Sequence, residues 1–403
     1  MKPRRAQLGL LALILAIAGG TAGAAPRVEG ADAAKPDASK SDPAKLAKTR
    51  GPSTLDAGLE RVAERLLRLA KPVEGAIVAL DPRTGRILAF DAVTSGSSFD
   101  VLTQARLPAA SLFKVVTTTA LFETTSLTPQ EQVCINGGVH GIERRHLEPA
   151  RGPGTECGRF AWALGHSKNA VFAQLATRLL TRDDLLKTAE RLGFNGKLPL
   201  DDGEEQAELG KLNVPYNDLD FARAAAGFQG SSLSPLGAAY LMTLIARGGS
   251  PIGLRLHEAT GEAAESPLDA QSSPLFSART AQRLTRMLEV TVETGTSRGA
   301  FTAPGGKRYL PGIRVAGKTG TLRPEPGRSE DTMTSWFVGF APSRNPEIVV
   351  SVMLVNGHTY RKKANELARD LLRTYFRAHG RAQSVSDPFA ESVPEPLAAA
   401  APQ

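Results

Sequence analysis

The spacing of apolar positions predicts helices and strands at both ends of an ordered region. Apolar residues recur at helical spacing over residues 55–70 and again over residues 364–376, so each segment gathers its apolar side chains on one helix face. Residues 75–80 and 87–90 have the apolar, β-prone character of two short strands. Residues 81–85 between them have the composition of a turn, which predicts a β-hairpin.

The middle of the chain has a different pattern. Residues 109–247 are predicted to be rich in helices, with Gly and Pro residues marking the breaks. Apolar, β-prone segments return at residues 313–316, 335–340 and 348–355. Strands at both ends of a helical middle predict an α+β fold, in which one sheet is built from distant segments, helices pack on it and a helical lobe is inserted.

The first 25 residues have the layout of a secretory signal peptide. Lys2, Arg4 and Arg5 precede an apolar run at residues 8–18, and small residues follow at 22–25. The run is shorter than the ~20 residues of an ordinary spanning helix. An uncleaved N-terminal anchor is the alternative, and membrane association is expected only if this segment is retained. Either interpretation predicts export.

Two further segments have few large apolar residues. Residues 26–53 and residues 382–403 are dominated by Ala, Pro, Ser and charged residues, which cannot offset the entropy lost on ordering. We expect a disordered tether and a disordered tail. Residues 54–381 remain as one folded domain.

Composition narrows the classes of partner. The chain has 403 residues with a formal net charge of +8, but cationic and anionic residues are interspersed and aromatic residues are few. No motif of a nucleic-acid-binding module is present, so we expect no nucleic-acid partner. The six histidines are scattered, and the sequence predicts neither a metal site nor a cofactor.

Cys134 and Cys157 are the two cysteines of the sequence. An exported chain meets an oxidising compartment, where a pair of cysteines tends to form a disulfide, and we favour that interpretation. Two buried free thiols are the alternative. Neither cysteine is accompanied by a His arrangement that would suggest catalysis.

Three short motifs occur in a suggestive order. Ser111 and Lys114 stand three residues apart, residues 167–169 are Ser-Lys-Asn, and residues 318–321 are Lys-Thr-Gly-Thr. Each is commonplace alone. A Ser and a Lys three residues apart on a helix share a face, so the Lys114 amine can approach the Ser111 hydroxyl.

That pair has the elements of nucleophilic catalysis. A hydroxyl needs a base at neutral pH, and an amine serves if burial and a second cation lower its pKa. Lys318 is the candidate second cation. Phe113 and the neighbouring valines 115 and 116 predict a partly apolar setting for Lys114. Pro108, just before Ser111, is expected near the first turn of the helix.

Acyl transfer also needs an oxyanion hole. The backbone N–H of Ser111 at a helix start is one candidate donor, and the N–H of Thr321 is the other if residues 318–321 form an edge strand. Gly320 would let a substrate backbone approach closely. An edge strand can also pair with an extended peptide.

The remaining polar residues have expected roles around the same substrate. Ser167 is expected to relay a proton between Lys114 or Lys318 and the leaving group. Asn169 holds Lys114 and the substrate amide. Thr319 and Thr321 bind the substrate carboxylate.

With these motifs in place, the chain resembles the transpeptidase domain of penicillin-binding proteins. The resemblance covers roughly residues 70–376. Residues 73–89 are similar to the first hairpin of that family, and residues 163–172 to its middle motif in context. Further similar stretches are residues 227–230, 234–235 and 336–342.

The resemblance implies an antiparallel sheet flanked by helices that meets an all-helical lobe, with the site between them. It implies that Ser111 is acylated by a peptidoglycan peptide stem ending in D-Ala-D-Ala and that the acyl group passes to an amine or to water. β-Lactam antibiotics would acylate the same serine. By the same carry-over, Lys114 is the base, Ser167 and Asn169 form the second motif, and residues 318–321 form the third. The implied location is the periplasm or cell envelope.

The chain also departs from the family. The sequence shows no glycan-polymerising domain, and the stretch before the first strand leaves no room for a pedestal domain. Residues 323–328 are expected to form a flap beside the cleft, and residues 134–157 a local elaboration.

Several alternatives share the site. A D,D-carboxypeptidase would use water as acceptor. A β-lactamase would add fast deacylation, but Asn169 argues against class D enzymes and no class A glutamate is identifiable. A non-catalytic scaffold or β-lactam sensor would keep the cleft only for binding.

Overall fold

The computed structural model describes residues 51–201, 205–258, 273–322, 332–357 and 361–380. The predicted signal peptide, the predicted tail and residues 323–328 lie outside these ranges. The prediction of a disordered tether is wrong for its last three residues. Ser53 pairs with His257, and the Pro52 carbonyl accepts from the N–H of Glu258 over 2.8 Å.

A five-stranded antiparallel sheet organises the fold, in the order β10-β11-β12-β1-β2. Its strands are β1 (Glu74–Leu80), β2 (Ile87–Val93), β10 (Ala316–Leu322), β11 (Met333–Ala341) and β12 (Ile348–Asn356). β1 pairs with both β2 and β12, so the two ends of the domain form one sheet, as predicted from the sequence. β10 lies at an edge.

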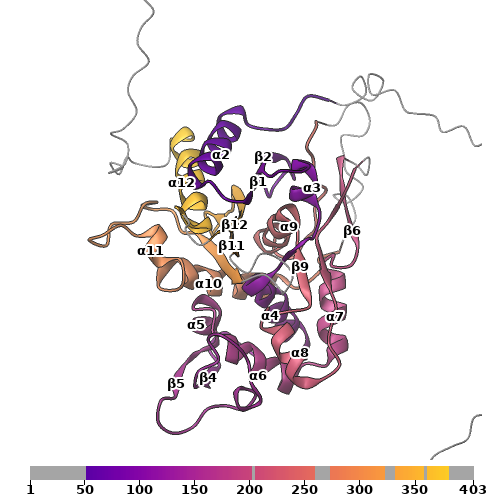
Figure 1. The fold of residues 1–403 in the computed structure, drawn as a ribbon, viewed down its shortest axis with the longest axis vertical. Coiled ribbons are helices and arrows are strands. Elements are labelled where there is room, and N and C mark those ends of the chain that lie inside the picture. The colour runs from indigo at the N-terminus through magenta and orange to yellow at the C-terminus, as the bar shows by residue number, and fades with distance from the viewer. Residues whose placement is uncertain (1–50, 202–204, 259–272, 323–331, 358–360, 381–403) are drawn as a thin grey trace, which may run out of the picture. The chain divides into compact units, whose positions relative to one another are not determined.

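Helices cover both faces of this sheet (Figure 1). The helices on one face are α2 (Ala57–Ala70) and α12 (Ala364–Ala378), and those on the other are α9 (Pro235–Ala246) and α10 (Ala278–Glu293). Side chains alternate between the faces of a strand. In β1, Val78 therefore packs in the core with α9, whereas Ile77 and Ala79 pack in the core with α2 and α12.

The inserted lobe is built mainly from helices, and Figure 1 shows it below the sheet. Its helices are α4 (Phe113–Thr124), α5 (Phe160–Gly165), α6 (Asn169–Leu179), α7 (Arg182–Arg191) and α8 (Asp218–Ala225). The α+β class is confirmed, but the lobe is not purely helical. A two-stranded ribbon, β4 (Gln132–Ile135) and β5 (Glu156–Arg159), projects from it.

Short elements complete the described chain. The short strands are β3 (Leu107–Pro108), β6 (Lys197–Leu200), β7 (Glu205–Glu208), β8 (Gly210–Leu212) and β9 (Ser231–Leu233). The short helices are α3 (Ser98–Thr103), α11 (Arg298–Phe301) and the 3-10 helices η1 (Ala110–Leu112) and η2 (Arg144–His146).

Two local predictions were wrong. Of residues 313–316, only Ala316 belongs to a strand. Ile313 and Val315 are apolar because their side chains pack in the core, and they do not pair in the sheet. Pro108 is not in the first turn of the helix but in β3, opposite Ser232. β3 is an edge strand, where a residue without an N–H is tolerated.

Candidate active site

Ser111 lies in η1, which leads directly into α4. Two hydrogen bonds fix the chain just before it: the Ala109 N–H donates to the Ser231 carbonyl, and the Trp336 indole N–H donates to the Pro108 carbonyl, each over 3.1 Å. Ala110 has a φ of +48°, in the left-handed region that a residue with a Cβ seldom adopts. The turn that presents Ser111 is thus strained, and its surroundings hold it in place.

Gly227 forms part of that support. Its φ is +82°, and a Cβ on it would lie 2.1 Å from the Ala110 carbonyl oxygen. Backbone approaches backbone so closely here that only glycine fits. This gives a physical reason for the glycine in residues 227–230, which the sequence analysis had noted only as a family resemblance.

Lys114 contacts the nucleophile directly. Its Nζ lies 2.6 Å from the Ser111 Oγ, and its side chain is completely buried. Burial, and secondly the charge of Lys318, hold the pKa of Lys114 well below its usual value of 10.5. A lowered pKa favours the neutral form of the amine, and a neutral amine at hydrogen-bond distance can act as base for a hydroxyl nucleophile.

Lys318 and Ser167 form the second polar contact of the site. Lys318 Nζ donates to the Ser167 Oγ over 3.1 Å and to the Thr319 carbonyl over 2.9 Å. Burial lowers the pKa of Lys318 to about 7. Ser167 has a φ of +57° in the turn between α5 and α6, and this strained conformation aims its hydroxyl at the strand.

Asn169 lines the same cleft but does not hold Lys114 as expected. Its Nδ2 donates to the Val139 carbonyl over 2.7 Å, and among the described residues it makes no hydrogen bond to Lys114. The reason is its position at the first residue of α6, beside the loop that follows β4. Asn169 therefore ties the second motif to that loop.

The third motif lies on the edge strand β10, as predicted. Gly320 has a different role from the expected one. A Cβ on it would meet the Ala110 Cβ at 3.3 Å and the Leu112 Cγ at 3.4 Å. Gly320 therefore lets β10 pack closely against the turn that carries Ser111, and its missing side chain faces that turn rather than a substrate.

A cleft of about 440 Å³ joins these groups. Its lining includes the hydroxyl-bearing residues Ser111, Ser167, Thr319 and Thr321, and no carboxylate belongs to the lining formed by the described residues. Trp336 and Asn356 also line it.

The sequence analysis missed Thr296, which also lines the cleft. Its Oγ1 lies 2.5 Å from the Thr319 Oγ1, and its N–H donates to the Gly165 carbonyl over 3.2 Å. The adjacent Gly295 permits this contact, because a Cβ there would lie 2.2 Å from the Gly165 oxygen. A Gly-Thr pair just after a helix was the available signal, and it is too common to stand out.

The two cysteines lie opposite each other in the β4-β5 ribbon, and their sulfur atoms form a disulfide of 2.08 Å.

Within the described ranges, no group of three or more His, Cys, Asp or Glu residues could hold a metal ion. No helix in the described part of the chain is long and apolar enough to cross a membrane.

Comparison with known proteins identifies the family. Residues 75–373 match the penicillin-binding protein transpeptidase domain. The chain belongs to this family. Among curated relatives, the peptidoglycan D,D-transpeptidase PbpA of Mycobacterium tuberculosis is 27% identical over 326 residues, covering 71% of this chain and 62% of the relative. Stage V sporulation protein D of Bacillus subtilis is 26% identical over 327 residues, covering 75% and 49%.

Solved structures of the family share the fold. Penicillin-binding protein A of M. tuberculosis, in a ceftriaxone acyl-enzyme complex, has a TM-score of 0.64 and 23% identity, over 81% of this chain and 79% of that one. The transpeptidase domain of penicillin-binding protein 3 from Burkholderia pseudomallei has a TM-score of 0.64 and 22% identity, over 83% and 98%. The chain spans less than two thirds of the length of the curated relatives named above.

Proposed function

We propose that this transpeptidase-family protein is a serine D,D-transpeptidase that acts on peptidoglycan stems ending in D-Ala-D-Ala. The observation that carries the proposal is the contact between the buried, low-pKa Lys114 and the Ser111 Oγ, 2.6 Å apart, beside the Lys318–Ser167 pair. Family membership and the curated names of the relatives support the same activity.

Acylation follows from this geometry. Lys114 accepts the Ser111 hydroxyl proton as Oγ attacks the carbonyl carbon of the penultimate D-Ala. The Ser111 and Thr321 N–H groups stabilise the oxyanion. The C–N bond then breaks, and the amine of the departing D-Ala takes a proton through Ser167, which Lys318 contacts. Thr319 and Thr321 bind the terminal carboxylate, and Asn169 contacts the substrate amide.

Transfer completes the cycle. The amine of a neighbouring stem attacks the ester carbonyl on Ser111, an amide bond forms, the ester bond to Oγ breaks, and a proton returns to the serine. Rapid hydrolysis would require a positioned base for water. No carboxylate lines the cleft among the described residues, which favours a long-lived acyl-enzyme over a β-lactamase.

The first experiment measures the intact mass of the purified protein during incubation with benzylpenicillin. We expect a persistent adduct in the wild type and none in Ser111→Ala. Ser98→Ala, which changes an exposed serine at the start of α3, is the matched control and should be acylated normally. An adduct on Ser111→Ala would contradict the assignment of the nucleophile, and rapid loss of the adduct with hydrolysed drug would indicate a β-lactamase.

A second measurement separates transfer from hydrolysis. The protein is given a donor peptide ending in D-Ala-D-Ala, with and without a stem bearing a free amine. Cross-linked product is expected when the acceptor is present. Release of D-Ala without any cross-linked product would indicate a D,D-carboxypeptidase, and the absence of both reactions would favour a scaffold or sensor.

The proposed location is the cell envelope, reached through the signal peptide at residues 1–25. The mass of the exported protein tests this: removal of that segment is expected, and retention would indicate a membrane anchor. The folded domain is proposed to span residues 54–381, extended at its start by residues 51–53, which pack beside residues 257 and 258.

A further inference from the structure

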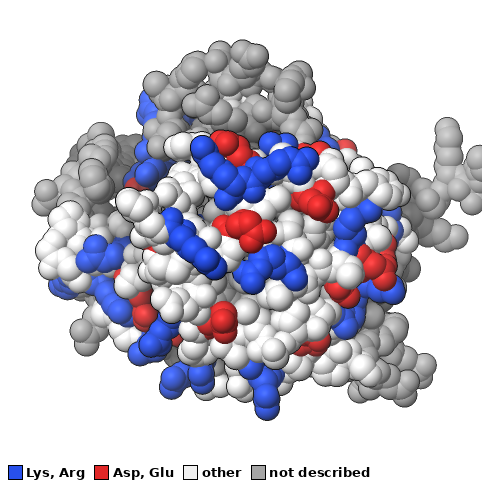
Figure 2. Space-filling view, turned by 90° about the horizontal axis from the view of Figure 1, so that it is seen from below, with Lys and Arg blue, Asp and Glu red and all other residues white. Residues whose placement is uncertain are grey.

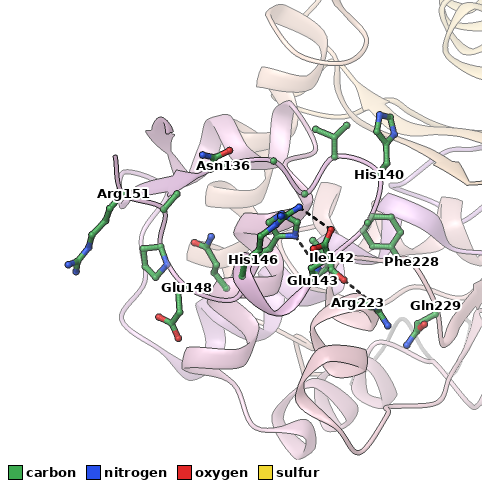
Figure 3. Close-up of a pocket in the computed structure, with 18 residues that line it drawn as sticks. Asn136, His140, Ile142, Glu143, His146, Glu148, Arg151, Arg223, Phe228 and Gln229 are labelled. Carbon is green, nitrogen blue, oxygen red and sulfur yellow. Dashed lines mark hydrogen bonds and ion pairs between the residues drawn. The ribbon is translucent and has the colours of Figure 1, made fainter. Parts of the chain in front are cut away.

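The helical lobe contains a second and larger cavity, of about 1230 Å³ (Figure 3). Its walls come from the loop after β4, from α6 through Gln174, from α8 through Arg223, and from Phe228 and Gln229. None of these side chains has a role in the acylation step proposed above. The cavity is large enough for several residues of an extended peptide.

This cavity meets the catalytic cleft at Val139, which lines both. The position of Val139 is fixed from the catalytic side, because its carbonyl accepts the hydrogen bond from Asn169. The preceding Gly138 packs so closely on α6 that a Cβ would lie 2.8 Å from the Ala170 Cβ. A molecule lying in the cavity would therefore reach the cleft that holds Ser111 by passing Val139.

Gln174 is the group in the cavity best placed to bind a ligand. The residue is only 4% exposed, and its side chain lines the cavity without a hydrogen bond to any described residue. Its amide is not fully enclosed, so in the cavity a ligand can supply the hydrogen bonds that water otherwise makes. An extended peptide backbone supplies both the donor and the acceptor that a primary amide can bind.

Charges of both signs surround the cavity. Glu143 and Arg145 form an ion pair of 3.1 Å, whereas Glu148 and Arg151 have no ion-pair partner among the described residues. Figure 3 shows Glu148 and Arg151 on the side opposite Phe228 and Gln229. On the face shown in Figure 2, cationic and anionic side chains are likewise interspersed. This mixture suits a peptide that carries both an amine and carboxylates better than it suits a polyanion.

We propose that the cavity binds the acceptor stem, with the Gln174 amide bonded to the backbone of that stem and its free amine directed past Val139 to the acylated Ser111. This inference rests on the proposed function and names the binding site of its second substrate. The acceptor amine displaces the Ser111 Oγ from the ester carbonyl, and its proton leaves through the same Lys114 that served acylation.

The test compares two variants of α6. Gln174→Met removes the amide at nearly constant volume, and Thr177→Val, one turn further on and outside the cavity, is the matched control. A donor whose D-alanyl carbonyl is joined to a thiol leaving group by a thiolester bond is supplied, and the KM for an acceptor is measured. The acceptor is a stem tripeptide that ends at the diamino acid, so it cannot act as donor.

We expect Gln174→Met to raise this KM about fivefold or more, the effect of losing one hydrogen bond to a ligand, and Thr177→Val to leave it unchanged. An unchanged KM in Gln174→Met would overturn the proposal. The proposal would also be overturned if the rate of benzylpenicillin acylation by Gln174→Met fell by the same factor, because that would indicate general damage to the fold.

Binding of the tripeptide to Ser111→Ala, measured by calorimetry, separates this inference from the proposed function. If the wild type forms no penicillin adduct, the activity fails, but weaker tripeptide binding in the Ser111→Ala/Gln174→Met double variant would still support the cavity as a stem site. Equal binding by the two proteins would overturn it.

Discussion

The indole N–H of Trp336, on β11 next to the edge strand β10, donates to the carbonyl of Pro108, three residues before the nucleophile, over 3.1 Å. Trp336 is buried and is the cross-strand neighbour of Gly320. One side chain thus joins the sheet, the third motif and the turn that carries Ser111.

Trp336→Phe keeps an aromatic side chain but removes this hydrogen bond together with part of the buried indole. We expect the free energy of unfolding to fall by about 1–2 kcal/mol, because the Pro108 carbonyl loses a partner. The second-order rate constant of benzylpenicillin acylation should fall about tenfold, since Ser111 loses its placement. Urea unfolding and stopped-flow acylation measure the two effects. An unchanged acylation rate would show that the other contacts suffice to place the turn.

Gly320→Ala tests the spacing between β10 and the turn of Ser111. The new Cβ would lie 3.3–3.4 Å from side-chain atoms of Ala110, Leu112 and Trp336, tighter than a relaxed contact. We expect slower acylation with a loss of stability of about 1 kcal/mol. Gly299→Ala, where a Cβ meets no atom within 4 Å, is the control. Equal acylation rates in the two variants would mean that this spacing is not important.

The pH dependence of acylation should report the pKa of Lys114. Acylation needs the neutral amine, so the rate rises with pH, and the lowered pKa places this rise well below 10.5. Lys318→Met removes the cation that contributes to the shift, so the rise should move to higher pH, in addition to any loss of rate. Burial is the larger cause and remains. A rise at the same pH in both proteins would exclude Lys318 as a cause.

Stability should also depend on pH through Lys318. Its pKa is about 7 in the folded protein and 10.5 as the ordinary value, so the unfolded chain binds more protons between these values. The free energy of unfolding should therefore rise as pH increases from about 7 to about 10.5, by at most about 1.4 kcal/mol per pH unit from this group. Lys318→Met should lack that contribution and be more stable than the wild type at pH 6. Parallel urea titrations across this range would detect it, and identical slopes would contradict it.

The disulfide between Cys134 and Cys157 closes a loop with a sequence separation of 23. Replacing both cysteines with serine should lower the free energy of unfolding by about 3 kcal/mol, mainly because the unfolded chain regains the freedom of that loop. The same loop forms a wall of the larger cavity, so the acceptor KM should rise as well. Denaturation under oxidising and reducing conditions gives the first effect. Wild-type protein that is equally stable in both would argue against the bridge.

Local patterns determined the part of this protein that depends on neighbours in sequence. Apolar periodicity located the first hairpin, the strands β11 and β12 and the helices α2 and α12 to within a few residues, because burial imposes that period directly. A spacing of three residues was enough to predict the contact between Ser111 and Lys114, since a helical turn brings such residues together.

Contacts between distant segments were decided only by the tertiary structure. Lys318 and Ser167 are 151 positions apart, and the motifs suggested that they meet without fixing which groups they contact. The packing of the lobe on the sheet decides three further features. Asn169 bonds to the Val139 carbonyl, Gly320 faces the turn that carries Ser111, and Val139 lines both cavities. A hydrophobic pattern in the sequence predicts that a residue is buried. Which residues it packs against is decided by the close packing of the whole domain.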